Sequence, residues 1–261
     1  MKFSGKVVLV TGASSGIGAA TAVHLAGKGA FLSITGRNET NLLKVAEECK
    51  AAGCSNPLIV AADLTKESDV RMLIEKTVQR YGKLDVLVNN AGIFEVGTIE
   101  TTSLDQFDRI LNTNIRPVYQ LTMLAVPYLI KSKGTVVNVS SVMGSKSFPG
   151  FLAYCVSKAA LDQFTKCVAL ELAPKGVRVN SVNPAVIETQ IFRRLGIDET
   201  TYRAFLTECK KTHALGRPGN PSEVAAAIEF LAGEDSSFIT GELLHVDGGR
   251  HVMCPVEEIN V

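Results

Sequence analysis

The chain has 261 residues, of which 46% are hydrophobic and 20% charged, and its formal net charge at pH 7 is +1. This near-neutral charge speaks against binding to nucleic acid or anionic lipid, and neither a signal-peptide segment nor an apolar run of roughly 18 residues suggests export or membrane insertion. Because the six cysteines show no metal-ligand spacing, we expect free thiols, no metal site, and a soluble intracellular protein, cytoplasmic by default.

Strand and helix patterns alternate along the whole chain. Short apolar runs typical of strands covered on both faces lie at 6–11, 30–35, 58–61, 84–88, 134–139, 177–182 and 243–246. Helical patterns lie at 17–28, 39–52, 66–81, 104–131, 153–173 and 221–232. This alternation predicts an α/β fold with a doubly wound parallel sheet of about seven strands between helices. No linker or low-complexity tract interrupts it, so we expect a single domain over 1–261.

Three glycines separate the first strand pattern from the first helix pattern. Gly12, Gly16 and Gly18 allow the backbone to approach a ligand closely, and they point the N-terminus of the following helix at a phosphate. Their spacing differs from G-x-G-x-x-G, so the position between strand and helix carries the argument for a nucleotide site. The alternative is a turn without a function.

Polar residues follow the fourth strand pattern and interrupt the longest helical one. Asn89 and Asn90 stand at the carboxyl end of a central strand, where doubly wound sheets bind ligands. Their amides either tie strand ends together or hydrogen-bond a ribose. Asn114 and Pro117 both disfavour a continuous helix over 104–131. We therefore expect a local break there, which serves either a function or a buried amide bonded to the backbone.

Tyr154 and Lys158 are four residues apart in a predicted helix, so their side chains lie on one face. A neighbouring cation favours the phenolate, which lowers a phenol pKa from its reference value of about 10 and makes the tyrosine a proton donor or acceptor. Ser141, before this helix, offers a hydroxyl that would hold a substrate oxygen against the phenol. Such a pair occurs by chance in many helices, so its meaning depends on the rest of the chain.

Two longer segments suggest how the domain is completed. The helix at 153–173 is apolar nearly all round, which indicates burial on two sides. The sheet covers one side, and a second subunit is the economical cover for the other. The segment 186–213 is longer than an ordinary connection, and we interpret it as a substrate loop or lid.

These motifs together resemble the short-chain dehydrogenases/reductases, in the branch of about 250 residues. The resemblance extends from Lys6 to Gly249 and rests on Thr11-Gly12, Gly16, Gly18, Asp63, Asn89-Asn90-Ala91-Gly92, Asn114, Ser141, Tyr154 and Lys158. It implies a seven-stranded parallel sheet that binds NAD(H) or NADP(H), and a homotetramer as the assembly. Ala185 departs from the family pattern, which usually has glycine after the Asn183-Pro184 pair.

The resemblance also implies roles for individual residues. Tyr154 would donate or accept the proton, Lys158 would lower its pKa and bond the nicotinamide ribose, and Ser141 would orient the substrate oxygen. Asn114 would hold a water that links Lys158 to solvent. The implied cofactor contacts are Gly12, Ser14, Ser15, Gly16, Ile17 and Gly18 at the diphosphate and adenosine side, Asp63 and Leu64 at the adenine, Asn90 at the adenosine ribose, Tyr154 and Lys158 at the nicotinamide ribose, and Ile187 and Thr189 at the carboxamide.

The end of the second strand pattern bears on the choice of cofactor. An acidic residue stands there in NAD-binding sheets of this kind, whereas this chain has Gly36 and Arg37, with no acid before Glu39. Gly36 leaves room for a 2′-phosphate, and the Arg37 guanidinium suits its oxygens. A solvated Arg37 is the alternative, and Ser14-Ser15 adds no second cation. We predict a preference for NADP(H), with NAD(H) as the alternative.

Aromatic and aliphatic residues near the expected site indicate a small, mainly apolar carbonyl or alcohol substrate. The candidate pocket residues are Phe94, Met143, Phe148, Phe151, Ile191, Phe192, Leu195, Tyr202 and Phe205. Core packing explains at least half of them equally well, and Arg193 and Arg194 are either a solvated surface or a contact for an anionic carrier. The sequence predicts an oxidoreductase that transfers a hydride between nicotinamide and a carbonyl or secondary alcohol. The alternative is a nucleotide-sensing protein of the same fold without catalysis.

Overall fold

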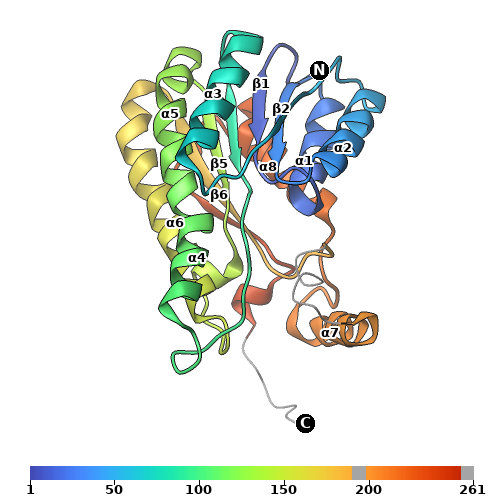
Figure 1. Cartoon of the computed structure of the whole chain (residues 1–261). Helices are drawn as coiled ribbons and strands as arrows, with labels where there is room; N and C mark the ends of the chain where they lie inside the picture. Colours follow the sequence, from blue (N-terminus) through green and yellow to red (C-terminus); the bar gives the residue numbers. More distant parts are fainter. Residues whose placement is uncertain (190–197, 254–261) are drawn as a thin grey trace.

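The computed structural model describes residues 1–189 and 198–253, and within them a single seven-stranded parallel sheet forms the centre of the molecule (Figure 1). The strands are β1 (Val7–Val10), β2 (Phe31–Gly36), β3 (Leu58–Ala61), β4 (Val86–Asn89), β5 (Thr135–Val139), β6 (Arg178–Pro184) and β7 (Leu243–Val246). Their order across the sheet is β3-β2-β1-β4-β5-β6-β7. The reversal between β1 and β4 opens a crevice at the carboxyl ends of the strands, where sheets of this type bind ligands.

Helices cover both faces of the sheet, as Figure 1 shows. One layer contains α1 (Gly16–Ala26), α2 (Glu39–Ala51) and α8 (Pro221–Ala232), and the other contains α3 (Glu67–Tyr81), α4 (Leu104–Asn114), α5 (Arg116–Ser132) and α6 (Leu152–Leu172). A further helix, α7 (Glu199–Thr212), lies apart from both layers, at the lower right of the view. The predicted doubly wound α/β fold is therefore confirmed.

The alternation of side chains along each strand divides the interior into two apolar cores. In β1, Val8 and Val10 pack with the α1, α2 and α8 layer. Val7 and Leu9 face the opposite way and pack with α3, α5 and α6. Because the central strands are covered on both sides, β1 is apolar throughout and β4 is apolar as far as Asn89, and this explains the short valine-rich runs of the sequence.

A chain of buried polar side chains connects the sheet to α6. The Asn89 amide donates a hydrogen bond to Asn138 Oδ1 at 2.9 Å. The Asn138 amide donates to Thr165 Oγ1 at 2.9 Å, and the Thr165 hydroxyl donates to the Leu161 carbonyl at 2.8 Å. These bonds run from β4 through β5 to the middle of α6. They set the position of that helix along the strand that precedes Ser141.

The helical stretch expected over 104–131 is two helices that break at Ile115. Pro117 lies at the start of α5, where its missing N–H costs little. The break falls directly after Asn114, as the sequence predicts. Within the segment 186–213, the described part contains α7, which the sequence pattern alone does not define.

The structure also bears on membrane insertion and on the state of the cysteines. Within residues 1–189 and 198–253, no helix is both long and apolar enough to cross a bilayer. The described cysteines are free thiols, as expected: Cys49, Cys54, Cys155, Cys167 and Cys209. Cys254 lies outside the described residues.

Candidate active site

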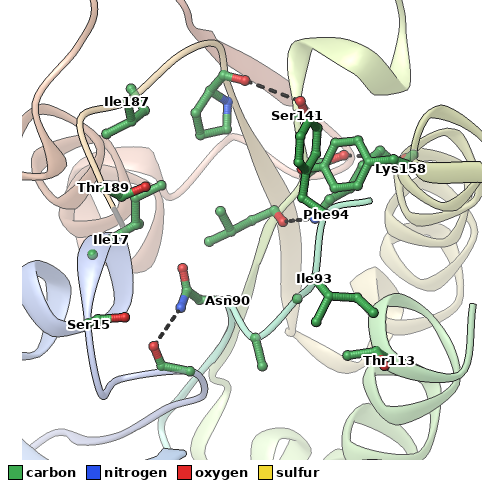
Figure 2. Close-up of a pocket in the computed structure, with 18 of the residues that line it drawn as sticks. Ser15, Ile17, Asn90, Ile93, Phe94, Thr113, Ser141, Lys158, Ile187 and Thr189 are labelled. Atoms are coloured by element: carbon green, nitrogen blue, oxygen red, sulfur yellow. Dashed lines mark hydrogen bonds between the residues drawn. The ribbon is translucent and has the colours of Figure 1, made fainter. Parts of the chain in front are cut away.

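A long cleft runs along the carboxyl ends of β1, β4, β5 and β6 (Figure 2). Ser15 and Ile17, at the start of α1, lie on one side of it, and Ser141 and Lys158 lie on the other. Most predicted site residues line it: Gly12, Ser14, Ser15, Gly16, Ile17, Arg37, Asp63, Leu64, Asn90, Ser141, Tyr154, Lys158, Ile187 and Thr189. Gly18 and Asn114 do not line the cleft. They lie behind its wall and support it.

The glycine loop is shaped by close backbone packing. Gly12 has a φ of +63°, and a Cβ built on it would lie 2.8 Å from Ala91 Cα. A Cβ on Gly18 would lie 2.4 Å from both Asn90 Nδ2 and the Gly12 carbonyl oxygen. No larger residue fits either position. Gly18 therefore brings α1 against the loop, while Gly12 opens the cleft next to the helix N-terminus.

Asn89 and Asn90 hold strand ends together. The Asn90 amide donates hydrogen bonds to the carbonyl oxygens of Thr11 at 2.8 Å and Gly12 at 3.2 Å, and the Asn90 N–H donates to Thr11 Oγ1 at 2.9 Å. Asn89 is buried within the polar chain already described. Of the two roles that the sequence left open, the structure shows the tying role, and Asn90 additionally lines the cleft.

The far end of the cleft, beyond the glycine loop, is open to solvent. Arg37 is exposed there, and its positive charge lowers the pKa of the Asp63 carboxyl, after the larger effect of hydrogen bonds from Thr65. A Cβ on Gly36 would lie 3.2 Å from the Ser14 side chain. Gly36 therefore allows β2 to end close to the glycine loop.

The opposite end of the cleft is closed and contains Ser141, Tyr154 and Lys158, all buried. Ser141 follows β5, and its hydroxyl oxygen accepts a hydrogen bond from the Met143 N–H at 3.1 Å. The Ser141 hydroxyl donates to the Pro184 carbonyl at 3.4 Å, and it lies close enough to the Tyr154 phenol to lower the pKa of that phenol. The Lys158 ammonium donates to the Val139 carbonyl at 2.8 Å and lies 5.6 Å from the centre of the Tyr154 ring. One helix face and one strand end thus place a hydroxyl, a phenol and an amine together.

Burial determines the protonation of this cluster. It raises the pKa of the Tyr154 phenol, and the neighbouring Ser141 hydroxyl offsets only part of that rise. It lowers the pKa of the Lys158 amine to about 8, against the opposing effect of Asp162. In this structure the desolvation of the phenol therefore outweighs any lowering of the tyrosine pKa by Lys158, whose ammonium is bonded to the Val139 carbonyl.

The Asn114 side chain is committed to the backbone of the neighbouring loop. Its Oδ1 accepts from the Ile93 N–H at 2.8 Å, and its amide donates to the Ile93 carbonyl at 3.0 Å and to Ser157 Oγ at 3.1 Å. These bonds join α4, the loop after β4 and α6. This is the structural alternative that the sequence left open, a buried amide bonded to the backbone, at the expected helix break.

Comparison with known proteins identifies the family. A family model described as enoyl-(acyl carrier protein) reductase matches residues 12–251. The chain is 39% identical to the 3-oxoacyl-[acyl-carrier-protein] reductase FabG of Thermotoga maritima, over 95% of this chain and 99% of that protein. The chain belongs to the short-chain dehydrogenase/reductase family. It is accordingly an NAD(P)-dependent oxidoreductase that acts on alcohol and carbonyl groups.

Other members of the family are similarly close. L-fucose dehydrogenase of Mus musculus is 38% identical, over 96% of this chain and 90% of that protein. The solved structure of a short-chain dehydrogenase/reductase of unknown function from Caenorhabditis elegans, with cofactor, superimposes with a TM-score of 0.92 at 36% identity and covers 98% of both chains. The family is thus certain, while the relatives differ in the substrates that their names give.

Two of the predicted pocket residues that the structure describes line the cleft of this dehydrogenase/reductase. Phe94 and Met143 line the cleft. Phe151 stacks on Phe94 at 5.1 Å between ring centroids, and Phe94 meets the Tyr154 ring edge-on at 4.8 Å, so both pack around the phenol. The residues that lie off the cleft are Phe148, Tyr202 and Phe205, and those outside the described residues are Ile191, Phe192, Arg193, Arg194 and Leu195.

Sequence reasoning missed one charged residue of the cleft. Arg250 lines it, although it comes from the turn after β7, near the end of the chain. The Gly248-Gly249 pair that precedes Arg250 was the available signal, because it turns the chain at the carboxyl edge of the sheet. Ala185 also lines the cleft at the position where the family usually has glycine.

Proposed function

We propose that this protein is an NADP(H)-preferring oxidoreductase that interconverts a carbonyl and a secondary alcohol on a small molecule, with Tyr154 as the general acid and base. The observation that carries the proposal is the convergence of Ser141, Tyr154 and Lys158 at the closed end of a cleft that continues to the glycine loop. A cluster of this composition can bind one oxygen atom and exchange one proton with it.

The shape of the cleft fits a dinucleotide. The cradle at Gly12 and Gly16, which a Cβ would fill or strain, leaves backbone at the N-terminus of α1 accessible to a diphosphate. Ser14, Ser15 and Ile17 would flank it, Asp63, Leu64 and Asn90 would border the adenosine, and Ile187 and Thr189 would contact the carboxamide. When bound, the nicotinamide supplies or accepts the hydride. Residues 186–213 would form the substrate lid of the single domain.

The proton is held at Tyr154. Because burial keeps the phenol protonated near neutral pH, it is ready to donate to a carbonyl oxygen as that oxygen becomes an alkoxide. Ser141 would share this oxygen through its hydroxyl and fix its distance from the phenol. In the reverse direction the phenolate takes the proton of the alcohol.

Lys158 would stabilise the charge that the proton transfer leaves behind. With a pKa of about 8, its amine is mostly protonated at neutral pH. The ammonium lies close enough to the ring to favour the phenolate formed in the reaction, and it would also bond the nicotinamide ribose. Asn114 would position Lys158 indirectly by holding the loop and α6, and its backbone carbonyl at the helix break would be the site for the relay water.

The preference for NADP(H) rests on charge at the open end of the cleft. Arg37 is the cation that lines this end, and its guanidinium suits the oxygens of a 2′-phosphate. Asp63 is close enough for Arg37 to influence its titration, so part of the charge of Arg37 is offset. We therefore expect a moderate preference for NADP(H) over NAD(H).

The outer surface of α4, α5 and α6 supports the expected homo-oligomer, with a tetramer favoured. Tyr119 is 61% exposed and Leu170 is 79% exposed, and Tyr119 meets Phe164 of α6 at 5.9 Å between rings. Met123 and Val156 extend this exposed apolar surface. Light scattering at micromolar concentration should give a mass several times 27.9 kDa, and a stable monomer would refute the assembly.

Turnover with a panel of ketones and aldehydes tests the activity directly. The purified protein is mixed with NADPH or NADH, and loss of the reduced nicotinamide is followed by absorbance. We expect carbonyl-dependent oxidation of NADPH. Tight binding of NADPH without turnover of any carbonyl or alcohol would instead identify a nucleotide-sensing protein.

A further inference from the structure

The turn after β7 is built to bring one arginine into the cleft. Gly248 and Gly249 have φ values of +59° and +80°, which few other residues adopt. A Cβ on Gly249 would lie 2.8 Å from Ala214 Cβ. The chain therefore turns tightly against the segment after α7 and enters the short helix η5 (Arg250–Val252) at the edge of the cleft.

Hydrogen bonds fix the backbone on both sides of Arg250. The Asp247 carboxylate accepts from the N–H groups of Gly249 at 3.0 Å and His251 at 2.7 Å, and it pairs with His251 Nδ1 at 2.8 Å. The Lys146 ammonium donates to the carbonyl oxygens of Arg250 at 3.3 Å and Met253 at 2.7 Å. These contacts tie η5 to the loop that follows Ser141.

The Arg250 guanidinium rests on an aromatic ring beside the substrate end of the cleft. Its Cζ lies 4.8 Å from the centre of the Phe148 ring, and Phe148 belongs to the same loop as Lys146. Arg250 lines the cleft together with Ser141, Met143 and Tyr154. The aromatic contact restricts the orientation of the guanidinium while leaving its N–H groups in one plane to a ligand.

This cation makes no ion pair with a carboxylate among residues 1–189 and 198–253, although the charge of Asp247 acts on it without direct contact. No ion pair or side-chain hydrogen bond joins the Arg250 guanidinium to a described carboxylate, and Asp247, the acid nearest in sequence, is already engaged by Gly249 and His251. Burial lowers the pKa of Arg250, although a guanidinium stays charged in proteins. A partly desolvated cation with unpaired donors is unfavourable until an anion binds it.

We infer that Arg250 binds a carboxylate carried by the substrate, at a distance from the carbon that reacts. The inference rests on the proposed carbonyl–alcohol activity and changes the expected substrate from a mainly apolar molecule to an oxo acid or hydroxy acid. Phe94 and Met143 would contact the apolar part of such a molecule. The bidentate contact with Arg250 would hold the far end while Ser141 and Tyr154 bind the reacting oxygen.

Matched pairs of oxo acids and their methyl esters test the inference through kcat/KM. The unmodified enzyme should prefer the acid by roughly 10- to 100-fold, the scale of a charge-assisted contact. Arg250→Met should remove this preference by slowing only the acid, and Arg250→Lys should keep part of it. Arg80→Met is the matched control, because Arg80 is exposed on α3 and its guanidinium lies 5.7 Å from the centre of the Tyr81 ring, away from the cleft. It should behave as the unmodified enzyme.

Three outcomes would overturn the inference. The first is that the unmodified enzyme uses acids and esters equally, and the second is that Arg250→Met slows both equally. The third is that Arg80→Met matches Arg250→Met, which would indicate a general effect of charge. NADPH affinity, measured by fluorescence, should not change in Arg250→Met. A parallel loss of NADPH affinity would assign the guanidinium to the cofactor and also overturn the inference.

A binding measurement separates this inference from the proposed activity. Phenylacetate and the neutral phenylacetamide are titrated calorimetrically into the NADPH-loaded enzyme and its Arg250→Met variant. Tighter binding of phenylacetate that depends on Arg250 supports the anion site even if no carbonyl is reduced, in which case the proposed activity alone fails. Reduction of carbonyls together with binding of phenylacetate that ignores Arg250 would refute the inference alone.

Discussion

The two ends of the cleft differ in their exposure to water. At the closed end, which we propose as the reacting end, Ser141, Tyr154 and Lys158 are buried, and hydrogen bonds hold Ser141 and Lys158 to β5 and its continuation. At the adenosine end, Arg37 is exposed and lies beside an open glycine loop. Charge interactions are strong in a buried site and weak in water. Substitutions at the closed end should therefore change turnover and stability strongly. Substitutions at the adenosine end should change cofactor affinity only weakly.

The largest effect should come from Tyr154→Phe. The variant keeps the ring that packs against Phe94 and removes only the proton donor. We expect turnover to fall by at least about 100-fold, the lower end of general acid catalysis. Steady-state kinetics with a carbonyl that the unmodified protein reduces gives the comparison.

Cofactor affinity is the control for Tyr154→Phe and should remain nearly unchanged. Near-normal turnover of the variant would remove Tyr154 from the mechanism. A collapse of NADPH binding would show that the phenol serves mainly to shape the site.

The next largest effect concerns stability, and it should depend on pH. Burial lowers the pKa of Lys158 from 10.5 to about 8, so the unfolded chain binds more protons than the folded one between these values, and stability rises with pH across that window. Below pH 8 the buried charge costs roughly 3 kcal/mol. Lys158→Met removes this cost, so its stability advantage over the unmodified protein should be greatest below pH 8 and disappear by pH 10.5.

Urea unfolding of both proteins at several pH values measures this difference. Lys158→Met also leaves the Val139 carbonyl without its donor, but that loss does not vary with pH. Lys166→Met, at an exposed position of the same helix, is the matched control and should show no such trend. A constant difference between Lys158→Met and the unmodified protein across the window would contradict the assigned pKa.

A smaller effect on stability is expected at Asn114, which supports the wall of the cleft between its two ends. Asn114→Ala leaves the Ile93 N–H and carbonyl without their side-chain partner, and it removes the bond that Ser157 Oγ accepts, while the Ser157 hydroxyl still donates to the Tyr154 carbonyl. An unsatisfied buried group costs about 1–3 kcal/mol, so the free energy of unfolding should fall by about this amount. Thr113→Ala, at the neighbouring position, is the control. If activity falls while stability does not, Asn114 acts mainly in proton relay.

Much of this arrangement could be predicted from the sequence, because local patterns carry it. The valine-rich strands, the glycine loop and the break at Asn114 depend on neighbouring residues and on backbone preference. The tyrosine pKa could not be predicted, because it depends on desolvation by residues far apart in the chain, such as Phe94. Arg250 was missed for the same reason, since η5 meets the loop at Phe148 only in the folded structure.

The smallest effect should arise at the adenosine end. Arg37→Gln should weaken NADPH binding by about tenfold, because the exposed charge is screened, and it should leave NADH binding unchanged. Arg71→Gln, exposed on α3, is the control. Dissociation constants for both cofactors decide the result, and tighter binding of NADH by the unmodified protein would refute the preference.

Reversing the preference requires a second change at this end. Gly36→Asp would place a carboxylate where a ribose is expected, but its Cβ would crowd the Ser14 side chain at 3.2 Å. The variant should therefore combine Gly36→Asp and Arg37→Gln with Ser14→Gly. We expect this combination to bind NADH more tightly than NADPH.

The buried polar chain from Asn89 to Leu161 limits how far Tyr154 on α6 can shift relative to Ser141 after β5. Asn138 stands three residues before Ser141, and Thr165 stands eleven residues after Tyr154. The hydrogen bond between Asn138 and Thr165 at 2.9 Å therefore relates the two hydroxyls of the proposed site through β5 and α6. A slip of one residue along a helix moves a side chain by about 1.5 Å. Misplacement on the order of 1 Å can slow a reaction about 100-fold. The Asn89 and Asn138 amides do not line the cleft, yet their hydrogen bonds hold α6 in register with β5 to less than the rise of one residue.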